Sequence, residues 1–231
     1  ESWRDSAQPL ESNVLATEYL FGALRDAGVR CRVLIPGSST VYAPSAEPIA
    51  ESHTIAPANP YAISKLAQEQ LALRAVEEDG LDVIVTRSFN HTGPRQTAAF
   101  VAPSMARQIA LIERGQLEPV IKVGNLEARR DVTDVRDVVR AYVALMQSGT
   151  TGVVYNVASG VARSIQSIVD ALVSRSHVPV RIEVDPTRLR PNDVPVIAGD
   201  YSRLTAATGW QPEIPFDSMM DDLLSYWLAH A

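Results

Sequence analysis

The stretch "RVLIPGSSTVY", residues 32–42, decides the fold that the sequence predicts. It is an apolar run that ends in small polar residues, as a buried strand of a parallel sheet does. A second run of this kind, "LDVIVTRSFN", covers residues 81–90, and a helical pattern over residues 61–78 lies between the two. Strands separated by helices predict an α/β fold with a parallel, doubly wound sheet.

The remainder of the chain continues this alternation of strand and helix. Three short apolar runs predict strands near Val120, Val154 and Ile182. Apolar residues at helical spacing predict helices over residues 10–26, 101–113, 135–147, 165–174, 203–208 and 217–229. The sequence shows no internal repeat and no obvious linker.

The composition limits the classes of function. The chain has 231 residues, a hydrophobic fraction of 46% and a formal net charge of -6, which argues against binding to nucleic acid or to an anionic membrane. Its single cysteine, Cys31, excludes an internal disulfide and gives no metal cluster, and we expect a buried thiol at the edge of a strand. No apolar run approaches the ~18 residues of a membrane span, so we expect a cytosolic protein.

Three polar side chains indicate a catalytic site at the carboxyl end of the predicted sheet, where open α/β sheets bind their ligands. Ser38 ends the first strand, and Tyr61 opens the next helix with Lys65 four residues later, on the same helix face. Such groups can converge on one carbonyl oxygen. Ser38 would polarise it, Tyr61 would transfer its proton, and the Lys65 ammonium would lower the phenol pKa and hold a ribose. This predicts hydride transfer; the alternative is a surface lysine on a solvated helix.

A glycine-rich turn is missing from the sequence. A doubly wound nucleotide enzyme should begin with a strand, such a turn and a helix, but the chain contains no G-x-G-x-x-G and opens on the polar stretch "ESWRDS". Either the protein uses no dinucleotide, or the sequence begins inside the fold.

Several motifs resemble the extended short-chain dehydrogenases that act on nucleotide sugars, the NAD-dependent epimerase and dehydratase family. They are "NVLAT" (residues 13–17), "SSTVY" (38–42), "NPYAISK" (59–65) and "RSFNHTGPRQ" (87–96). Within this family, "VGNLEARRDVTDVRDVVRAY", "YNVASG" and "RLRPNDVPV" are similar to reductases of GDP-linked 4-keto-6-deoxy sugars. The resemblance covers essentially the whole chain and implies that roughly 70 to 80 residues with the glycine-rich turn precede Glu1.

The resemblance also implies the ligands and the residues that bind them. The cofactor would be NADP, with NAD as an alternative, and the substrate a small nucleotide sugar. The implied catalytic residues are Ser38, Tyr61 and Lys65, and the implied cofactor contacts are Tyr61, Lys65 and Asn13. The implied substrate contacts are Thr40, Asn90, His91, Val101, Ser104, Arg130, Arg190 and Asp193.

The substrate contacts have different implied roles. Arg130 and Arg190 match arginines that clasp the diphosphate, which suits a planar donor facing phosphate oxygens. Asp193 matches an acid that accepts ribose hydroxyls, whereas Val101 and Ser104 lie where relatives contact the base. Asn90 and His91 match contacts to the sugar diphosphate, and a turn-capping amide is the alternative for Asn90.

Thr40 distinguishes the reactions that the family implies. The related 4,6-dehydratases use a glutamate at this position to take a proton from the sugar, and a threonine cannot act as that base at neutral pH. The sequence therefore favours simple reduction at C4 of a GDP-4-keto-6-deoxyhexose, in the biosynthesis of a deoxysugar of the GDP-rhamnose type. A 4-epimerase or a 4,6-dehydratase remains the alternative enzyme, and a non-catalytic binding module the alternative class.

The resemblance finally predicts the organisation of the chain. Residues 1–95 would form the C-terminal part of a dinucleotide-binding domain with the catalytic residues. Residues 96–231 would largely bind the nucleotide sugar, with some segments that return to the first domain. The helices over residues 10–26 and 61–78 resemble the pair that joins two subunits in relatives, so we expect a homodimer.

Overall fold

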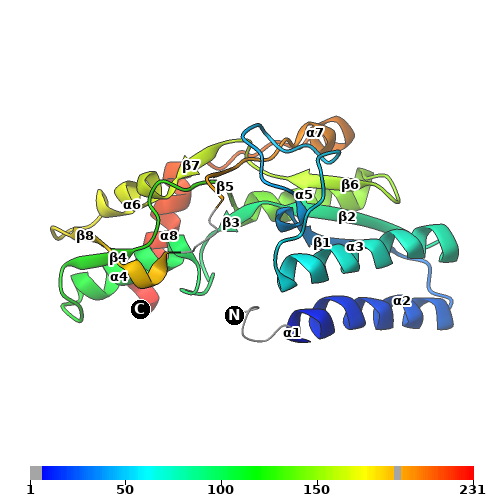
Figure 1. Ribbon diagram of the computed structural model, residues 1–231, viewed down its shortest axis with the longest axis horizontal. Helices are drawn as coiled ribbons and strands as arrows, with labels where there is room; N and C mark the ends of the chain where they lie inside the picture. The colour runs from blue at the N-terminus through cyan, green and yellow to red at the C-terminus, as the bar shows by residue number, and fades with distance from the viewer. Residues whose placement is uncertain (1–6, 190–193) are drawn as a thin grey trace.

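The structure is a computed structural model that describes residues 7–189 and 194–231. Three parallel strands form its first sheet in the order β1 (Arg32–Ser38), β2 (Asp82–Ser88) and β6 (Val154–Val157). The register places Ser38 beside Ser88, so these two strands end at the same edge. The parallel sheet expected from the two apolar runs is confirmed (Figure 1).

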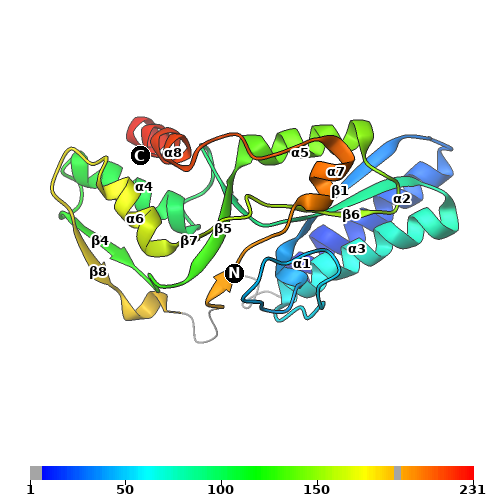
Figure 2. The same cartoon turned by 90° about the horizontal axis from the view of Figure 1, so that it is seen from above.

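Helices cover both faces of this sheet because side chains alternate between the faces along β2. Val83 and Val85 pack against α2 (Ala16–Asp26) and α3 (Pro60–Asp79), as Phe21 and Ala72 show. Ile84 points the other way, into a cluster with α5 (Val135–Ser148) and α7 (Ser202–Thr208). Figure 2 shows α5 and α7 on the side of the sheet opposite to α2 and α3.

A second lobe holds the largest apolar cluster. Its helices are α4 (Val101–Glu113), α6 (Ile165–Val173) and α8 (Phe216–His230), whose apolar faces bury Ile109, Ile168, Leu172 and Leu223. The two-stranded sheet of β4 (Val120–Val123) and β8 (Arg181–Val184) packs on the same cluster.

A mixed sheet connects the two lobes. Its central strand, β5 (Arg129–Asp134), pairs with β3 (Asn90–Thr92) and β9 (Val196–Ile197) in parallel and with β7 (Ala162–Ser164) in antiparallel orientation. The Asp131 carboxylate is fully buried and accepts hydrogen bonds from the backbone N–H groups of Ser159, Gly160 and Gly199. These bonds hold the loops on either side of β5 against the strand.

A buried ion pair ties α3 to the first sheet. Arg87 on β2 donates from Nε and Nη2 to the two carboxylate oxygens of Glu69, over 2.8 and 2.6 Å. Its Nη1 donates to the phenol of Tyr42. Because Arg87 and Glu69 are 6% and 2% exposed, each charge depends on the other for its stabilisation.

The short elements differ most from the sequence-based expectation. The helix expected over residues 10–26 begins earlier, as the short α-helix α1 (Ala7–Pro9), continues as a π-helical segment, η1 (Leu10–Leu15), and is α-helical again from Ala16. Two short 3-10 turns, η2 (Ser39–Val41) and η3 (Pro186–Arg188), complete the described elements. The expectation for Cys31 was wrong: it is exposed, because it precedes β1 and does not reach the sheet interior. Within the described residues, no helix is long and apolar enough to cross a membrane.

Candidate active site

Ser38 sits at the carboxyl end of β1 because Gly37 lets this strand approach β2 closely. A Cβ at Gly37 would lie 2.2 Å from the carbonyl oxygen of Thr86, so a larger residue would displace the strand. The Ser38 side chain is 8% exposed, and its Oγ lies 3.0 Å from Oγ1 of Thr40. Thr40 also donates its backbone N–H to Ser38 Oγ, over 3.3 Å. The serine hydroxyl is thus held at the sheet edge beside an exposed threonine hydroxyl.

Tyr61 and Lys65 lie on the first turns of α3. The side chain of Asn59 caps this helix by accepting from the N–H of Ala62, and Pro60 occupies its first position. Lys65 Nζ donates to the carbonyl oxygen of Pro36 on β1 and to Oε1 of Gln68, both over 2.9 Å. It lies 6.0 Å from the centroid of the Tyr61 ring.

The pKa of Tyr61 differs from the sequence-based expectation. Burial raises the pKa of the phenol, hydrogen bonding to Ser38 opposes this rise, and the nearby Tyr142 adds to it. Burial also lowers the pKa of the Lys65 ammonium. The phenol therefore stays protonated at neutral pH, which is the state that a proton donor needs.

Asn13 lies in η1 and contacts α3 rather than the sheet edge. Its Nδ2 donates to Ser64 Oγ over 3.0 Å, and Ser64 Oγ donates to the carbonyl oxygen of Tyr61 over 2.8 Å. A π-helical segment is frequent at functional sites, where it changes which side chains face a neighbour. A direct cofactor contact of Asn13 stays a prediction.

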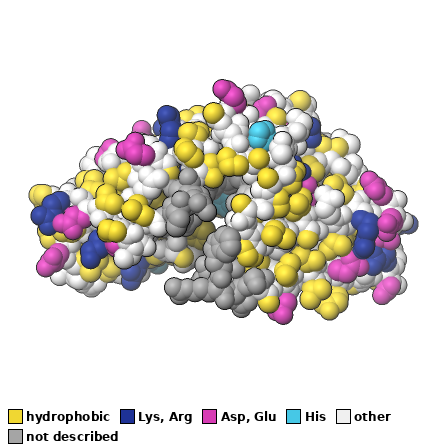
Figure 3. Space-filling view, viewed as in Figure 1, with side chains coloured by type: hydrophobic (Ala, Val, Ile, Leu, Met, Phe, Trp, Pro, Cys, Tyr) yellow, Lys and Arg dark blue, Asp and Glu magenta, His cyan; other side chains and the backbone are white. Residues whose placement is uncertain are grey.

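Most of the predicted substrate residues that the structure describes line one large cavity of about 610 Å³, formed by β3, α4, β4 and β5, but Thr40 does not line it. Figure 3 shows the face of the molecule hollowed between the lobes. The predicted residues that the structure brings together there are Asn90, His91, Val101, Ser104 and Arg130. Arg190 and Asp193 lie outside the described residues, so their predicted roles stay open.

Two strands and one helix position the side chains of this cavity. Asn90 and His91 belong to β3, which follows β2 after a single residue and pairs with β5. Nδ1 of His91 lies 3.1 Å from the carbonyl oxygen of Phe89; a neutral ring donates there and keeps Nε2 as an acceptor. Arg130 donates to the carbonyl oxygen of Val194 over 2.7 Å. Val101 opens α4, so the N-terminus of this helix lies at the cavity.

The cavity contains polar residues that were not predicted from the sequence. Lys122, Asn125 and Arg188 line it together with the predicted residues. Lys122 could have been noticed as one of only two lysines, on a strand where alternate residues are buried. Its proximity to Asn90 depends on the fold of the second lobe. An anionic ligand such as a diphosphate suits these cations.

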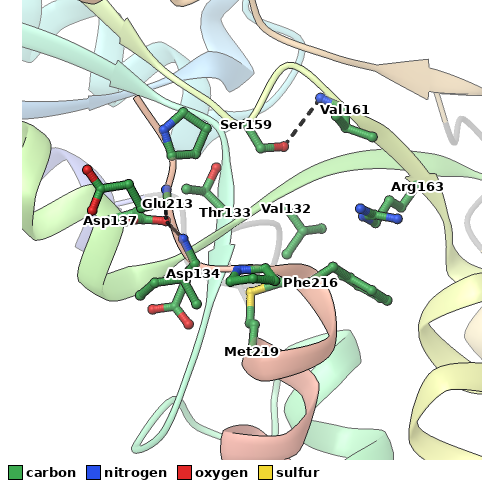
Figure 4. A pocket seen from close by; sticks show the side chains of 13 residues that line it. Val132, Thr133, Asp134, Asp137, Ser159, Val161, Arg163, Glu213, Phe216 and Met219 are labelled. Carbon is green, nitrogen blue, oxygen red and sulfur yellow. Dashed lines mark hydrogen bonds between the residues drawn. The ribbon is translucent and has the colours of Figure 1, made fainter. Parts of the chain in front are cut away.

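A smaller cavity of about 200 Å³ lies between β5 and α8 and contains none of the predicted site residues (Figure 4). Val132 lines both cavities. The Arg163 guanidinium stacks on the ring of Phe216, 4.2 Å from its centroid, at the edge of this cavity. Across the described residues, no group of three or more acidic, histidine or cysteine side chains could hold a metal ion.

Comparisons with known proteins place the chain among nucleotide-sugar enzymes. The family model for GDP-mannose 4,6 dehydratase matches residues 1–223. The chain is 40% identical to GDP-6-deoxy-D-mannose reductase from Pseudomonas aeruginosa over 230 residues, which cover 98% of this chain and 76% of that protein. It is 27% identical to GDP-mannose 4,6 dehydratase from Cricetulus griseus, covering 91% of this chain and 62% of that protein.

Solved structures give the same picture. The structure of RMD from Pseudomonas aeruginosa complexed with NADPH matches 100% of this chain and 77% of its own, with a TM-score of 0.94 and 38% sequence identity. A putative epimerase from Burkholderia cenocepacia matches 97% of this chain and 73% of its own, with a TM-score of 0.87 and 32% identity.

Proposed function

The chain belongs to the GDP-mannose 4,6-dehydratase family, and we propose that the complete protein is a reductase of this family. It transfers hydride from NADPH to C4 of a GDP-4-keto-6-deoxyhexose. One observation carries the proposal: Ser38, Tyr61 and Lys65 lie at the carboxyl end of the first sheet, and the cavity with Arg130 begins where the next strand ends. The likeness to GDP-6-deoxy-D-mannose reductase supports this reaction over the others of the family.

Tyr61 and Ser38 would act on the carbonyl oxygen of the substrate. The ordinary pKa of a tyrosine already keeps Tyr61 protonated at neutral pH, and partial burial raises that pKa further, so the phenol can give its proton to the C4 oxygen as this oxygen gains charge. Ser38 donates a second hydrogen bond to the same oxygen. These donors accelerate the reaction because they meet charge that develops only in the transition state.

The residues at the end of the first sheet fit a nicotinamide cofactor. Two of the three N–H donors of the Lys65 ammonium are bound within the protein, which leaves one for a ribose hydroxyl. When bound, NADPH supplies the hydride. The solved relative with NADPH supports this cofactor, while other family structures hold NAD.

The nucleotide sugar would occupy the large cavity. Arg130 and, by resemblance, Arg190 would bind the diphosphate, and Asp193 would accept ribose hydroxyls. Asn90 and His91 would contact the sugar diphosphate, whereas Val101 and Ser104 at the start of α4 would contact the base. Lys122 and Arg188 add positive charge to the same cavity.

Thr40 separates reduction from dehydration. Its hydroxyl lies 3.0 Å from Ser38 Oγ, in the place where the dehydratases of the family carry a glutamate. A hydroxyl cannot take the C5 proton that dehydration requires at neutral pH. A 4-epimerase is the second candidate, because solved epimerase-like relatives share the fold.

One experiment separates the three reactions. The complete protein is incubated with NADPH and either GDP-mannose or its 4-keto-6-deoxy derivative. NADPH oxidation is followed by the absorbance of NADPH, and the sugar products are identified separately. Reduction predicts consumption of NADPH with the 4-keto sugar alone. Formation of a 4-keto product from GDP-mannose would indicate a dehydratase, and interconversion of C4 isomers with tightly retained NAD would indicate an epimerase.

We also propose the setting of the protein. The exposed apolar residues of η1 and α2, together with Ile63 on α3, support a homodimer formed through these helices. Hydrophobic side chains gather over this region in Figure 3. A cytosolic location is proposed because NADPH and nucleotide sugars are available there. The division into residues 1–95 and 96–231 remains a proposal.

A further inference from the structure

A chain of hydrogen bonds runs from Lys65 into the helix that precedes the first strand. Lys65 Nζ donates to Gln68 Oε1 over 2.9 Å, and Gln68 Nε2 donates to Thr17 Oγ1 over 2.8 Å. Thr17 Oγ1 then donates to the carbonyl oxygen of Asn13 over 2.7 Å. These three hydrogen bonds connect the ammonium to the π-helical segment η1.

The direction of this chain is fixed by its chemistry. A threonine hydroxyl has one hydrogen, and Thr17 uses it on the Asn13 carbonyl. It can therefore only accept from Gln68, which must present its NH₂ to Thr17 and its oxygen to Lys65. The amide orientation thus follows from its neighbours, and the oxygen faces the ammonium.

Gln68 and Thr17 are buried, so their hydrogen bonds matter for stability. Gln68 and Thr17 are 8% and 5% exposed, so an unmatched polar atom at either position would carry a desolvation penalty. The side chain of Asn13 donates a hydrogen bond to Ser64 Oγ, which donates to the carbonyl oxygen of Tyr61. The backbone and the side chain of Asn13 therefore end two chains, one from each residue of the Tyr61–Lys65 pair.

Among the residues that the structure describes, the carboxylates of α2 and α3 nearest to Lys65 pair with arginines and do not replace this neutral partner. On α3, the neighbouring Glu69 forms an ion pair with Arg87. On α2, Glu18 pairs with Arg25 and Arg74. The ammonium donates to the Pro36 carbonyl oxygen on β1 and lies near the Tyr61 ring on its own helix. Tyr142 on α5 interacts with Tyr61, and its hydroxyl is hydrogen-bonded to Ser88.

We propose that Gln68 is a positioning residue, which holds the Lys65 ammonium in one orientation through an uncharged oxygen and leaves one N–H for the cofactor. Thr17 supports it by fixing the orientation of the amide. The proposal rests on the proposed function for its effect on turnover, but the placement of Lys65 can be tested without turnover. Burial already lowers the pKa of Lys65, and a neutral partner leaves that effect in place.

The test uses the scarcity of lysine in this chain. Lys65 and Lys122 are the only lysines of the 231 residues and fall in different peptides, so acetic anhydride labelling as a function of pH, read by peptide mass spectrometry, reports each of these two amines separately. Gln68→Glu puts a carboxylate on the ammonium with little change in shape. Because an opposite charge this close shifts a pKa by about one unit or more, Lys65 labelling at fixed pH should slow on the order of 10-fold. Lys122 should label as before.

Gln68→Leu gives the opposite change. It removes the acceptor that favours the charged amine, so Lys65 should label faster than in the original protein. Gln116→Glu is the matched control, because it adds the same charge at an exposed turn. All variants are made in the complete protein, and circular dichroism confirms that they are folded.

The outcomes separate this inference from the proposed reaction. Unchanged Lys65 labelling in folded Gln68→Glu overturns the inference, whether or not the protein reduces a 4-keto sugar. If the protein is active, Gln68→Glu should also move the alkaline limb of the kcat profile to higher pH, because the added carboxylate offsets the ammonium charge that lowers the pKa of Tyr61, so the phenol keeps its proton to higher pH. A labelling change without a change in this profile would overturn the link to turnover.

Discussion

At the scale of single residues, the acid strength of Tyr61 sets the pH range of the reaction. Burial raises the pKa of the phenol, so the proton donor is present throughout neutral pH and is lost only as pH rises through that raised value. We predict that kcat for reduction stays nearly constant around pH 7 and falls in alkaline buffer. A rate profile at saturating substrate checks this, and a fall that begins below pH 7 would contradict it.

The loss of the Tyr61 hydroxyl tests its role directly. Tyr61→Phe should reduce kcat on the order of 10²-fold or more while the affinity for the nucleotide sugar is nearly retained, because general acid catalysis contributes roughly 10² to 10⁴. Tyr226→Phe, on α8, is the control and should be as active as the unchanged protein. Activity that survives Tyr61→Phe would assign the proton transfer to another group.

Single residues differ in how far the sequence predicted them. Ser38, Tyr61 and Lys65 could be predicted because a strand end and an i, i+4 pair bring them together locally. The contact between Gln68 and Thr17 could not be predicted, because these two residues lie 51 positions apart in the chain, on different helices. The expected direction of the Tyr61 pKa shift also differs from the structure, where burial of the phenol raises its pKa.

At the scale of elements, the contact between α3 and β2 depends on the buried pair of Arg87 and Glu69. Arg87→Leu leaves the Glu69 carboxylate buried without its partner and should lower the free energy of unfolding by about 3 to 5 kcal/mol. Urea unfolding followed by circular dichroism measures this. The double variant Arg87→Leu, Glu69→Leu should recover part of the loss, since no charge is left unpaired.

A surface pair provides the control for this prediction. Arg181 and Glu183 form an ion pair with side chains that are 71% and 49% exposed. Arg181→Leu should therefore change the stability by less than about 1 kcal/mol. Equal losses for Arg87→Leu and Arg181→Leu would show that the α3–β2 pair contributes no more than a surface contact.

The elements with a clear period were the predictable ones. The helices α4, α5, α6 and α8 lie close to the expected ranges, because each has an apolar face. The range of α3 was also close, because Asn59 and Pro60 begin this helix and Gly80 ends it. The strands β3, β5, β7 and β9 were missed. β3, β5 and β7 are largely polar and β9 has only two residues, so their pairing depends on distant partners rather than on a local pattern.

At the scale of the whole molecule, the apolar surface of η1 and α2 predicts assembly. Leu15, Tyr19 and Leu20 are 47%, 72% and 44% exposed. Tyr19→Glu should convert a dimer of the complete protein to a monomer, because a charge is then buried in the proposed interface. Light scattering at micromolar concentration gives the mass. Val184→Glu on the exposed strand β8 is the control and should leave the mass unchanged.

The strand β5 has a consequence for how ligands enter. Around Arg129 and Arg130 it is hydrogen-bonded to a neighbour on each side, and Asp131 fastens the loops that follow β6 and β9. A hinge motion that separated the two lobes would have to break the hydrogen bonds between β5 and its neighbouring strands. Deuterium uptake in β5 should accordingly be slow and stay slow throughout the catalytic cycle, so that substrate is admitted and product released by segments at the cavity mouth while the lobes keep their relative orientation.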